Sequence, residues 1–284
     1  MIKILGRVSL TVLLTLAFAG ALLVAALLTA VEFFAPPSFS TSLATVQNVT
    51  ADAWLVFDPG AGQIIYDHNS EAVLPMASIA KLPAAKVFYD KADIWATTTI
   101  TWSDLAHDGR AGSLAYGEIY SFHELLFPLL LNSSNDAAGN LERNHPSLIE
   151  EMNTYAEGLN LNKTVFADAS GLTASGVTTA RELSRIVSDI KSSNQHLLNI
   201  TSLPFYSSGE RGWRNNNPFV SDARYTGGKH GYTPEAGYTA VAIFNEYLKN
   251  GVEREVGYVL LGSSDLEYDV SLLRNQVQTY VSFK

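Results

Sequence analysis

The sequence contains no cysteine among its 284 residues. This absence excludes a disulfide scaffold, a thiolate zinc site, an iron–sulfur cluster and a cysteine nucleophile. Basic residues are also few, because 19 Lys and Arg stand against 28 Asp and Glu, and the formal net charge is −9. An acidic chain is a poor candidate for binding nucleic acid, so no nucleic-acid partner is expected. The length is sufficient for one large domain with a sizeable core.

A second absence is local, since no charged residue lies between Val8 and Val31. As a helix, this stretch of about 24 residues spans about 36 Å, which exceeds the ~30 Å hydrocarbon core of a bilayer. Lys3 and Arg7 precede the stretch, and no Lys or Arg follows until Lys81. By the positive-inside rule, this asymmetry places the N-terminus in the cytoplasm and the remainder of the chain outside.

We therefore expect residues 1–34 to form a single-pass transmembrane anchor in the cell membrane. The domain that follows is expected to be extracytoplasmic, either periplasmic or on the outer face. The alternative is a secretory signal peptide, cleaved after a small-x-small triplet such as Ala17-Phe18-Ala19. The apolar run continues well past that triplet and is longer than a typical signal core, which favours the anchor. Residues 35–51 are small, polar and uncharged, and they are expected to form a linker.

The order of β-rich and helical segments predicts an α/β (α+β) fold. Strands are predicted at 54–57, 63–66, 225–231, 238–244 and 256–262. Helices are predicted at 79–90, 122–131, 146–159, 180–190 and 266–281. The strands therefore come from both ends of a domain at 52–284, with an all-helical subdomain inserted at about 92–200. We expect a sheet flanked by helices, with a ligand cleft where the sheet meets the inserted subdomain.

Several hydrolase signatures are also missing, including G-x-S-x-G, H-E-x-x-H and the P-loop. The six His have no metal-ligand spacing, so neither a metal nor a cofactor is expected. Two Ser-x-x-Lys matches are present, at Ser78–Lys81 and Ser188–Lys191. Residues i and i+3 share a face of a helix, so a neutral Lys can take the Ser proton and activate the hydroxyl as a nucleophile.

Sequence context separates the two matches. Ser188 lies near the end of a predicted helix, where we expect Lys191 to be solvated. Ser78 lies at a helix start, where free N–H groups and the positive end of the helix dipole favour a developing negative charge. At the start of another predicted helix we expect an ion pair between Arg181 and Glu182.

Two further motifs follow along the chain. Ser133-Ser134-Asn135 comes after an apolar helix, and Lys229-His230-Gly231 lies on a predicted strand. Ser-x-x-Lys, Ser-x-Asn and Lys-x-Gly in this order are the pattern of penicillin-recognising acyl-serine enzymes. From about residue 52 to the C-terminus, the chain resembles the serine-type D-alanyl-D-alanine carboxypeptidases, the low-molecular-weight penicillin-binding proteins. Beyond the motifs, the resemblance extends over residues 55–66, 74–82, 132–138, 166–172, 178–183 and 237–238.

This resemblance implies a β-lactamase/D,D-peptidase-like fold with an antiparallel sheet, and removal of the terminal D-Ala from a peptidoglycan stem peptide. Ser78 would attack the penultimate carbonyl, Lys81 would be the general base, and Ser133 would relay the proton to the leaving amine. The backbone N–H groups of Ser78 and Tyr232 would form the oxyanion hole. β-Lactams would acylate the same serine. The implied substrate-binding residues are Asn135, Lys229, His230, Gly231 and Tyr232.

As a general base, Lys81 must be neutral near pH 7, although free lysine has a pKa of ~10.4. Lowering the pKa by about 3 requires roughly 4 kcal/mol. A second ammonium, Lys229, could supply about 4 kcal/mol if the two charges lie about 4 Å apart at an effective dielectric constant of about 20. Burial of Lys81 in the cleft would act in the same direction.

Two features depart from the family pattern. Relatives usually have Thr at the position of His230, and the Thr hydroxyl is thought to bind the terminal carboxylate of the substrate. His230 could replace that hydroxyl as an N–H donor, more strongly if protonated, or it could fill the site. Relatives also often have an Arg near this carboxylate, whereas residues 263–269 contain no base. These departures leave the specificity for a free carboxylate open.

Three alternatives to the carboxypeptidase therefore stand beside it. A D,D-endopeptidase would cleave cross-links, which have no free terminal carboxylate of this kind. A class A-like β-lactamase uses the same motifs but needs a carboxylate that activates the deacylating water, for which Asp168 is the candidate. A non-catalytic homologue would bind the wall peptide without cleaving it. The sequence carries no indication of the oligomeric state.

Overall fold

The computed structural model describes residues 38–41, 46–106, 108–109 and 111–283. The chain divides into two compact units, a small one of residues 1–40 and 283–284 and a large one, Thr41–Ser282. The predicted anchor at 1–34 and part of the predicted linker lie outside the described residues. Within the described part of the chain, no helix has the length and apolar character needed to cross a membrane. The described residues nearest the two ends of the chain form the short strands β1 (Phe39–Thr41) and β13 (Val281–Phe283).

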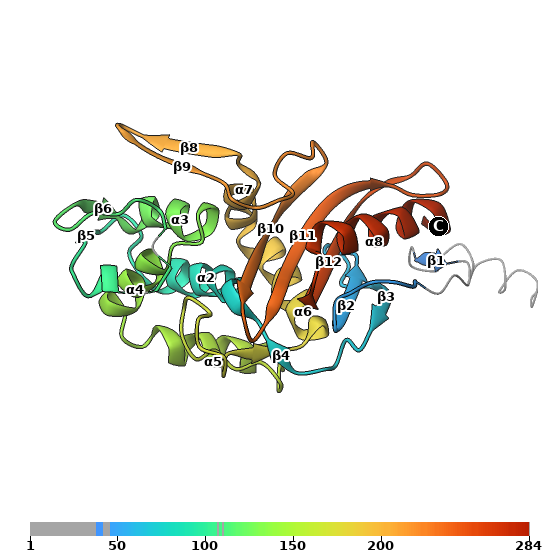
Figure 1. Cartoon of the computed structure of the whole chain (residues 1–284), viewed down its shortest axis with the longest axis horizontal. Helices are drawn as coiled ribbons and strands as arrows, with labels where there is room; N and C mark the ends of the chain where they lie inside the picture. Colours follow the sequence, from blue (N-terminus) through green and yellow to red (C-terminus); the bar gives the residue numbers. More distant parts are fainter. Residues whose placement is uncertain (1–37, 42–45, 107, 110, 284) are drawn as a thin grey trace, which may run out of the picture. The chain divides into compact units, whose positions relative to one another are not determined.

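The large unit is built on a five-stranded sheet with the strand order β10-β11-β12-β2-β3 (Figure 1). Every neighbouring pair in this sheet is antiparallel. Its strands are β2 (Ala53–Phe57), β3 (Ile64–His68), β10 (Tyr225–Thr233), β11 (Gly237–Tyr247) and β12 (Glu253–Ser263). Because β2 pairs with β12, strands from both ends of the unit meet in one sheet, as the sequence pattern indicated.

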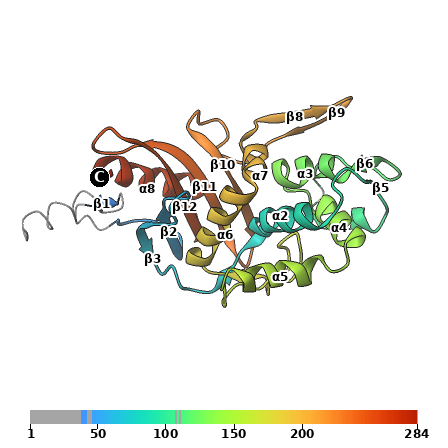
Figure 2. The ribbon, with the colours of Figure 1, turned by 180° about the vertical axis from the view of Figure 1, so that it is seen from behind.

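Helices cover both faces of this sheet. α8 (Leu266–Tyr280) packs on β11 and β12, whereas α6 (Ala180–Ser193) packs on β2 and β12, and α7 (Gln195–Ser202) packs on β10. α8 lies in front of the sheet in Figure 1 and α6 lies in front of it in Figure 2, so the two helices are on opposite faces. β12 is consequently buried on both sides, and its residues 256–261 form a continuous buried run.

The chain between β3 and β10 is mainly helical. The helical elements before α6 are η1 (Ala77–Ala80), α2 (Lys81–Lys91), η2 (Asp104–Ala106), α3 (Phe122–Leu131), α4 (Asn135–Asn144) and α5 (Leu148–Gly158). The short strands are β4 (Leu74–Pro75), β5 (Thr97–Thr99), β6 (Ile119–Ser121) and β7 (Val177–Thr178). The prediction of an all-helical block at 92–200 was therefore wrong in detail, because β5 pairs with β6 and β7 pairs with β4.

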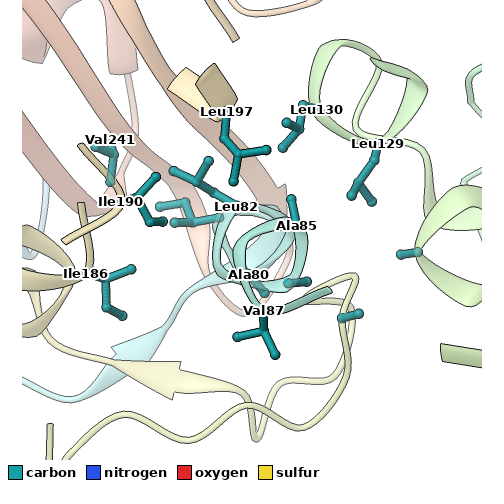
Figure 3. Close-up of a cluster of buried hydrophobic side chains, with 14 of the residues drawn as sticks. Ala80, Leu82, Ala85, Val87, Leu129, Leu130, Ile186, Ile190, Leu197 and Val241 are labelled. Atoms are coloured by element: carbon teal, nitrogen blue, oxygen red, sulfur yellow. The ribbon is translucent and has the colours of Figure 1, made fainter. Parts of the chain in front are cut away.

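Helix α2 lies at the centre of the helical region. Its first eight residues are all buried, and it packs against α3, α5, α6 and α7. Figure 3 shows Leu82 and Ala85 of α2 surrounded by Leu130 of α3, Leu197 of α7 and Val241 of β11. A fully buried Leu contributes about 2 kcal/mol relative to an exposed one. This packing fixes the position of the residues at the N-terminus of α2, which include the Ser-x-x-Lys motif.

The hairpin of β8 (Phe205–Ser208) and β9 (Arg211–Arg214) was not predicted. Aromatic rings attach it to the helical region, since the ring of Tyr206 stacks on Phe127 of α3 with centroids 3.4 Å apart. The indole N–H of Trp213 donates to the carbonyl of Gly112 at 2.8 Å. Strands of four residues are too short to give a clear alternation in the sequence, and contacts with distant residues decide their structure.

Candidate active site

The 3-10 helix η1 contains Ser78, and Lys81 is the first residue of α2. Residues three apart in a 3-10 turn lie above one another, which brings the two side chains together. Lys81 Nζ is 2.9 Å from Ser78 Oγ, and it also donates to the carbonyl of Ser170 at 2.6 Å. The predicted contact of serine and lysine is therefore present, although the turn that contains Ser78 is 3-10 and not α-helical.

Lys81 is completely buried. Burial is the main cause that holds its pKa well below the usual range, the charge of Lys229 lowers the pKa further, and Asp168 acts in the opposite direction. Both causes, the charge of Lys229 and burial, were expected from the sequence, but not their order. Lys229 is itself buried, which lowers its pKa to about 7. It therefore carries only part of a positive charge near neutral pH, and loss of hydration is the stronger effect on Lys81.

The side chains of the second motif, Ser-x-Asn, present two unpaired atoms. Ser133 has a left-handed backbone (φ 58°), and its Oγ is buried without a hydrogen-bond partner among the described residues. Asn135 begins α4 and donates from Nδ2 to the carbonyl of Asp108, while its buried Oδ1 has no partner in the described chain. Buried polar atoms are normally hydrogen-bonded, so these two atoms are available to a ligand.

Strand β10 carries the third motif and passes beside η1. Lys229 Nζ donates to the carbonyl of His230 at 2.6 Å. A Cβ atom on Gly231 would lie 2.5 Å from the backbone nitrogen of Ser78, so only glycine permits this close approach. Tyr232 follows with its ring exposed to solvent. Strand β10 therefore packs directly against η1, the 3-10 turn that contains Ser78.

His230 is neutral in this environment. Burial lowers its pKa to about 3, and the nearby charges of Lys229 and Lys81 act in the same direction. Of the possibilities left open for His230, a protonated side chain that donates to a carboxylate is disfavoured, because burial opposes a positive charge there. The Nδ1 atom is buried and has no partner among the described residues. His230 also lines a cavity of about 430 Å³ that borders the start of α8.

The loop at 168–171 shapes the site in a way that sequence reasoning missed. Asp168 Oδ1 accepts from the backbone nitrogens of Ser170 and Gly171 at 2.8 and 2.5 Å, which orients the carbonyl that Lys81 contacts. Gly171 has φ 76°, and a Cβ there would lie 1.8 Å from the carbonyl oxygen of Ala77. The signal in the sequence was an Asp-x-x-Gly turn, which reveals a local turn but not its distant neighbour.

Burial acts to raise the pKa of Asp168, but hydrogen bonds from the side chains of Ser170 and Thr173 and from backbone N–H groups outweigh it and lower the pKa. Both carboxylate oxygens accept backbone N–H groups. Asp168 is thus occupied in holding the turn. This arrangement counts against its use as the base that activates water in a class A-like β-lactamase.

Other expected pairings differ from the structure. Lys191 is only partly exposed, and its Nζ contacts the carboxylate of Glu255 on β12 at 2.5 Å. The ion pair of Arg181 with Glu182 is also wrong, since Arg181 contacts Glu71 at 2.7 Å. Glu182 is buried and accepts hydrogen bonds elsewhere. Successive residues on a helix point in different directions, so adjacency in the sequence did not produce a contact.

A larger cavity, of about 600 Å³, includes none of the motif residues and is lined by Asp58, Gly60, Asn245, Glu253, Arg254 and Glu255. Over the described ranges, no group of three or more His, Asp or Glu could hold a metal ion.

A comparison with protein families decides the classification. The profile described as D-alanyl-D-alanine carboxypeptidase, of the S11 peptidases, matches residues 40–250. The chain belongs to this family. It is a serine hydrolase of the D,D-peptidase type, with the α+β fold that the sequence predicted.

Individual relatives carry two activities in their names. The chain is 29% identical over 231 residues to the D-alanyl-D-alanine endopeptidase of Pseudomonas aeruginosa. This aligned region covers 75% of this chain and 72% of the relative. It is 30% identical over 204 residues to the D-alanyl-D-alanine carboxypeptidase DacB2 of Mycobacterium tuberculosis. This region covers 67% of this chain and 69% of the relative. A crystal structure of a D-alanyl-D-alanine carboxypeptidase from M. tuberculosis superimposes with a TM-score of 0.74 at 25% identity, over 82% and 92% of the two chains.

Proposed function

We propose that this D,D-peptidase removes the terminal D-Ala from peptidoglycan stem peptides through an ester on Ser78. The observation that carries this proposal is the 2.9 Å contact between Ser78 Oγ and Lys81 Nζ, with the pKa of Lys81 held low by burial. A neutral amine within hydrogen-bond distance of a hydroxyl is the arrangement that general-base activation of a serine requires.

In the first step, the proton of the Ser78 hydroxyl passes to the lone pair of Lys81 Nζ while Oγ attacks the penultimate D-Ala carbonyl. One N–H of Lys81 already donates to the carbonyl of Ser170, which supports a fixed direction for the lone pair. The backbone N–H groups of Ser78 and Tyr232 stabilise the oxyanion. The C–N bond then breaks, and water later hydrolyses the ester.

The leaving amine needs a proton, and we assign this transfer to Ser133. The support is the buried Ser133 Oγ without a partner among the described residues. Asn135 binds the substrate backbone through its unpaired Oδ1, and Lys229, His230 and Gly231 complete the binding site along β10. A β-lactam would acylate Ser78 in the same way as the peptide. These residues lie in a catalytic domain at 52–284.

A D,D-endopeptidase that cleaves cross-links is the second candidate. The observation that favours it is the neutral His230, which stands in place of the usual Thr, together with the lack of any base in residues 263–269. The P. aeruginosa relative is named an endopeptidase. The retained contact of Ser78 with Lys81 counts against a non-catalytic wall-peptide-binding homologue.

For localisation, we propose that residues 1–34 anchor the protein in the cell membrane with the N-terminus in the cytoplasm. The support is the uncharged run from Val8 to Val31 that follows Lys3 and Arg7. The catalytic domain would then be extracytoplasmic, on the side where a peptidoglycan substrate is found. Protease added to intact spheroplasts should digest the domain, and full protection of the domain would contradict this orientation.

The activity is tested by incubating the full chain with a pentapeptide ending in D-Ala-D-Ala and, separately, with a cross-linked peptide dimer. Mass analysis should show release of D-Ala from the pentapeptide, and Ser78→Ala should abolish this product. Cleavage of the dimer alone would establish the endopeptidase instead. If neither substrate is cleaved while both bind, the protein is a binding homologue and the proposal is wrong.

A further inference from the structure

A groove in the helical region has no part in the proposed reaction. Its volume is about 530 Å³, which is within the range of small-ligand sites. It lies between η2, α4 and the start of α5. Its lining includes the polar side chains of Ser103, Glu142 and Arg143 and the apolar side chains of Leu148 and Ile149. A mixed lining of this kind suits a ligand that has both hydroxyl groups and apolar faces.

Helix α4 connects this groove to the substrate-binding site. Asn135 is the first residue of α4 and binds the substrate backbone in the proposed reaction. Gly139 and Glu142 follow on the same helix and line the groove. Because they lie four and seven positions after Asn135, the three residues share one face of the helix. The groove is therefore reached from Asn135 along a single face of α4.

A hydrogen bond also joins the groove to the loop that shapes the active site. Glu142 Oε1 accepts the backbone N–H of Ala169 at 2.6 Å. Ala169 precedes Ser170, whose carbonyl accepts a hydrogen bond from Lys81. The groove thus borders the active site on the side of the general base.

An exposed pair of aromatic rings stands next to the groove in the chain. Trp102 immediately precedes Ser103, which lines the groove. The ring of Trp102 stacks on that of Tyr116, with centroids 4.6 Å apart and an angle of 11° between the planes. Trp102 is 68% exposed and Tyr116 is 58% exposed, so both rings remain largely in contact with solvent. Flat aromatic faces bind the C–H groups of a sugar ring, and neighbouring polar side chains bind its hydroxyls.

The length of a stem peptide fits the distance from the active site to this groove. In a pentapeptide stem, four residues lie between the sugar of the glycan strand and the bond that is cleaved. Four extended residues span about 14 Å. Glu142 is seven positions after Asn135, which corresponds to about 10 Å along the axis of α4. A stem that runs from Ser78 past Asn135 and along α4 therefore brings its sugar to the groove.

We propose that this groove and the Trp102–Tyr116 pair bind the sugar of the glycan strand that carries the stem peptide. The enzyme then acts on glycan-linked stems in preference to free peptides. This inference rests on the proposed peptidase function and specifies its substrate class. The aromatic pair contacts the apolar face of the sugar ring, and the polar lining of the groove binds the hydroxyl and N-acetyl groups. Binding of the sugar holds the stem along α4 while Ser78 attacks the penultimate carbonyl.

The test compares two substrates of the full chain, a pentapeptide linked to an N-acetylated disaccharide and the same pentapeptide without sugar. We expect kcat/KM to be about tenfold higher for the sugar-linked substrate, which is the contribution of one stacked ring. The double variant Trp102→Ala with Tyr116→Ala should lower this ratio to about one. The ratio is unaffected by a loss of folded protein, because both rates then fall equally. If only cross-links are cleaved, the same ratio is measured on cross-linked dimers with and without the disaccharides.

Trp95→Ala is the matched control. Trp95 is 69% exposed and stacks on His123 with centroids 4.7 Å apart, but neither Trp95 nor its neighbours in the chain line the groove. This variant should leave the ratio unchanged. A ratio of one in the unmodified protein, or an equal fall in the Trp95 variant, would overturn the proposal for the glycan alone.

Two further results have separate meanings. Weaker binding of the double variant to vesicles of anionic lipid, with an unchanged substrate ratio, would assign the aromatic pair to the bilayer surface and overturn the proposal for the glycan. Failure to cleave any of the substrates, together with no labelling of Ser78 by penicillin, would instead overturn the peptidase function.

Discussion

Two buried lysines dominate the chemistry at the scale of single residues. Lys81 and Lys229 are both almost free of solvent contact, and burial lowers the pKa of each. The difference between the pKa of Lys229 in the fold, about 7, and its ordinary value of 10.5 corresponds to roughly 4 kcal/mol at pH 7. The active site therefore reduces the stability of the fold in order to keep an amine available for catalysis.

We predict that Lys229→Met stabilises the protein at pH 7 while slowing acylation. Loss of the hydrogen bond from Lys229 to the carbonyl of His230 costs about 1 kcal/mol, so the free energy of unfolding should rise by about 3 kcal/mol at pH 7. Because the folded pKa is lowered, the unfolded chain binds more protons between pH 7 and 10.5, and wild-type stability rises with pH over this window. The gain should therefore shrink towards pH 10.5. Urea unfolding at several pH values measures it.

Lys163→Met provides the control, since Lys163 is largely exposed and contacts Glu71 on the surface. Its effect on stability should be within about 1 kcal/mol. A Lys229→Met protein that is less stable than wild type at pH 7 would contradict the assignment of a lowered pKa to Lys229.

The local part of the site was accessible from the sequence. The contact of Ser78 with Lys81 follows from their spacing together with their place at a helix start, so it could be predicted before any tertiary structure was known. Gly171 and Thr239 were missed, because their contacts in the site depend on the tertiary structure. Gly171 is needed because the backbone of Ala77 passes it, and Thr239 donates to the carbonyl of Met76, and both contacts join segments distant in sequence.

At the scale of elements, helix caps position the second motif. Ser121 caps α3 in a capping box with Glu124, and Ser134 caps α4 by accepting from the backbone of Ala137. Ser134 also donates to the carbonyl of Ala111 at 2.6 Å. It lies between the two residues assigned to proton relay and substrate binding, so its cap serves the site as well as the helix.

We predict that Ser121→Ala and Ser134→Ala each lower the free energy of unfolding by about 1 kcal/mol. Only Ser134→Ala should also slow acylation, because its loss releases the turn that presents Ser133 and Asn135. Urea unfolding gives the first quantity and the rate of labelling by a fluorescent penicillin gives the second. Equal labelling rates in the two variants would show that the cap of α4 has no part in positioning the site.

Long elements with clear periodicity were predicted well, as were the five-residue strands β2 and β3, whereas the shortest strands were not. α3 has the predicted bounds, and α8 ends one residue earlier than expected. The strand predicted at 238–244 proved longer, as β11 (Gly237–Tyr247). The β8–β9 hairpin and the β5–β6 pair were missed, because their strands have three or four residues and depend on contacts made only in the folded chain.

At the scale of the large unit, a buried ion cluster fastens α8 to the sheet. Glu246 on β11 is fully buried, and Arg274 on α8 donates from Nε to its carboxylate at 2.5 Å. Arg274 also contacts Asp222 at 2.6 Å, and its guanidinium lies 3.8 Å from the centre of the Phe244 ring. This cluster could not be predicted from the sequence. Its members are far apart in the chain, and no local pattern indicates that they meet.

We predict that Arg274→Met lowers the free energy of unfolding by about 3 to 5 kcal/mol, because it leaves the charge of Glu246 buried without its main partner. Adding Glu246→Leu should recover part of the loss, since it removes that charge. Urea unfolding of both variants measures this coupling. A double variant that is less stable than the single one would show that the unpaired charge of Glu246 is not the cause of the loss.

The central claim is that Ser78 forms a covalent acyl-enzyme with Lys81 as its base. The most direct test is mass spectrometry of the full chain after brief exposure to a penicillin, with peptide mapping of the adduct. The account predicts one added acyl group on the peptide that contains Ser78, and a strong decrease of the adduct in both Ser78→Ala and Lys81→Met. An adduct on another serine, such as Ser133 or Ser188, or undiminished labelling of Ser78→Ala, would contradict it.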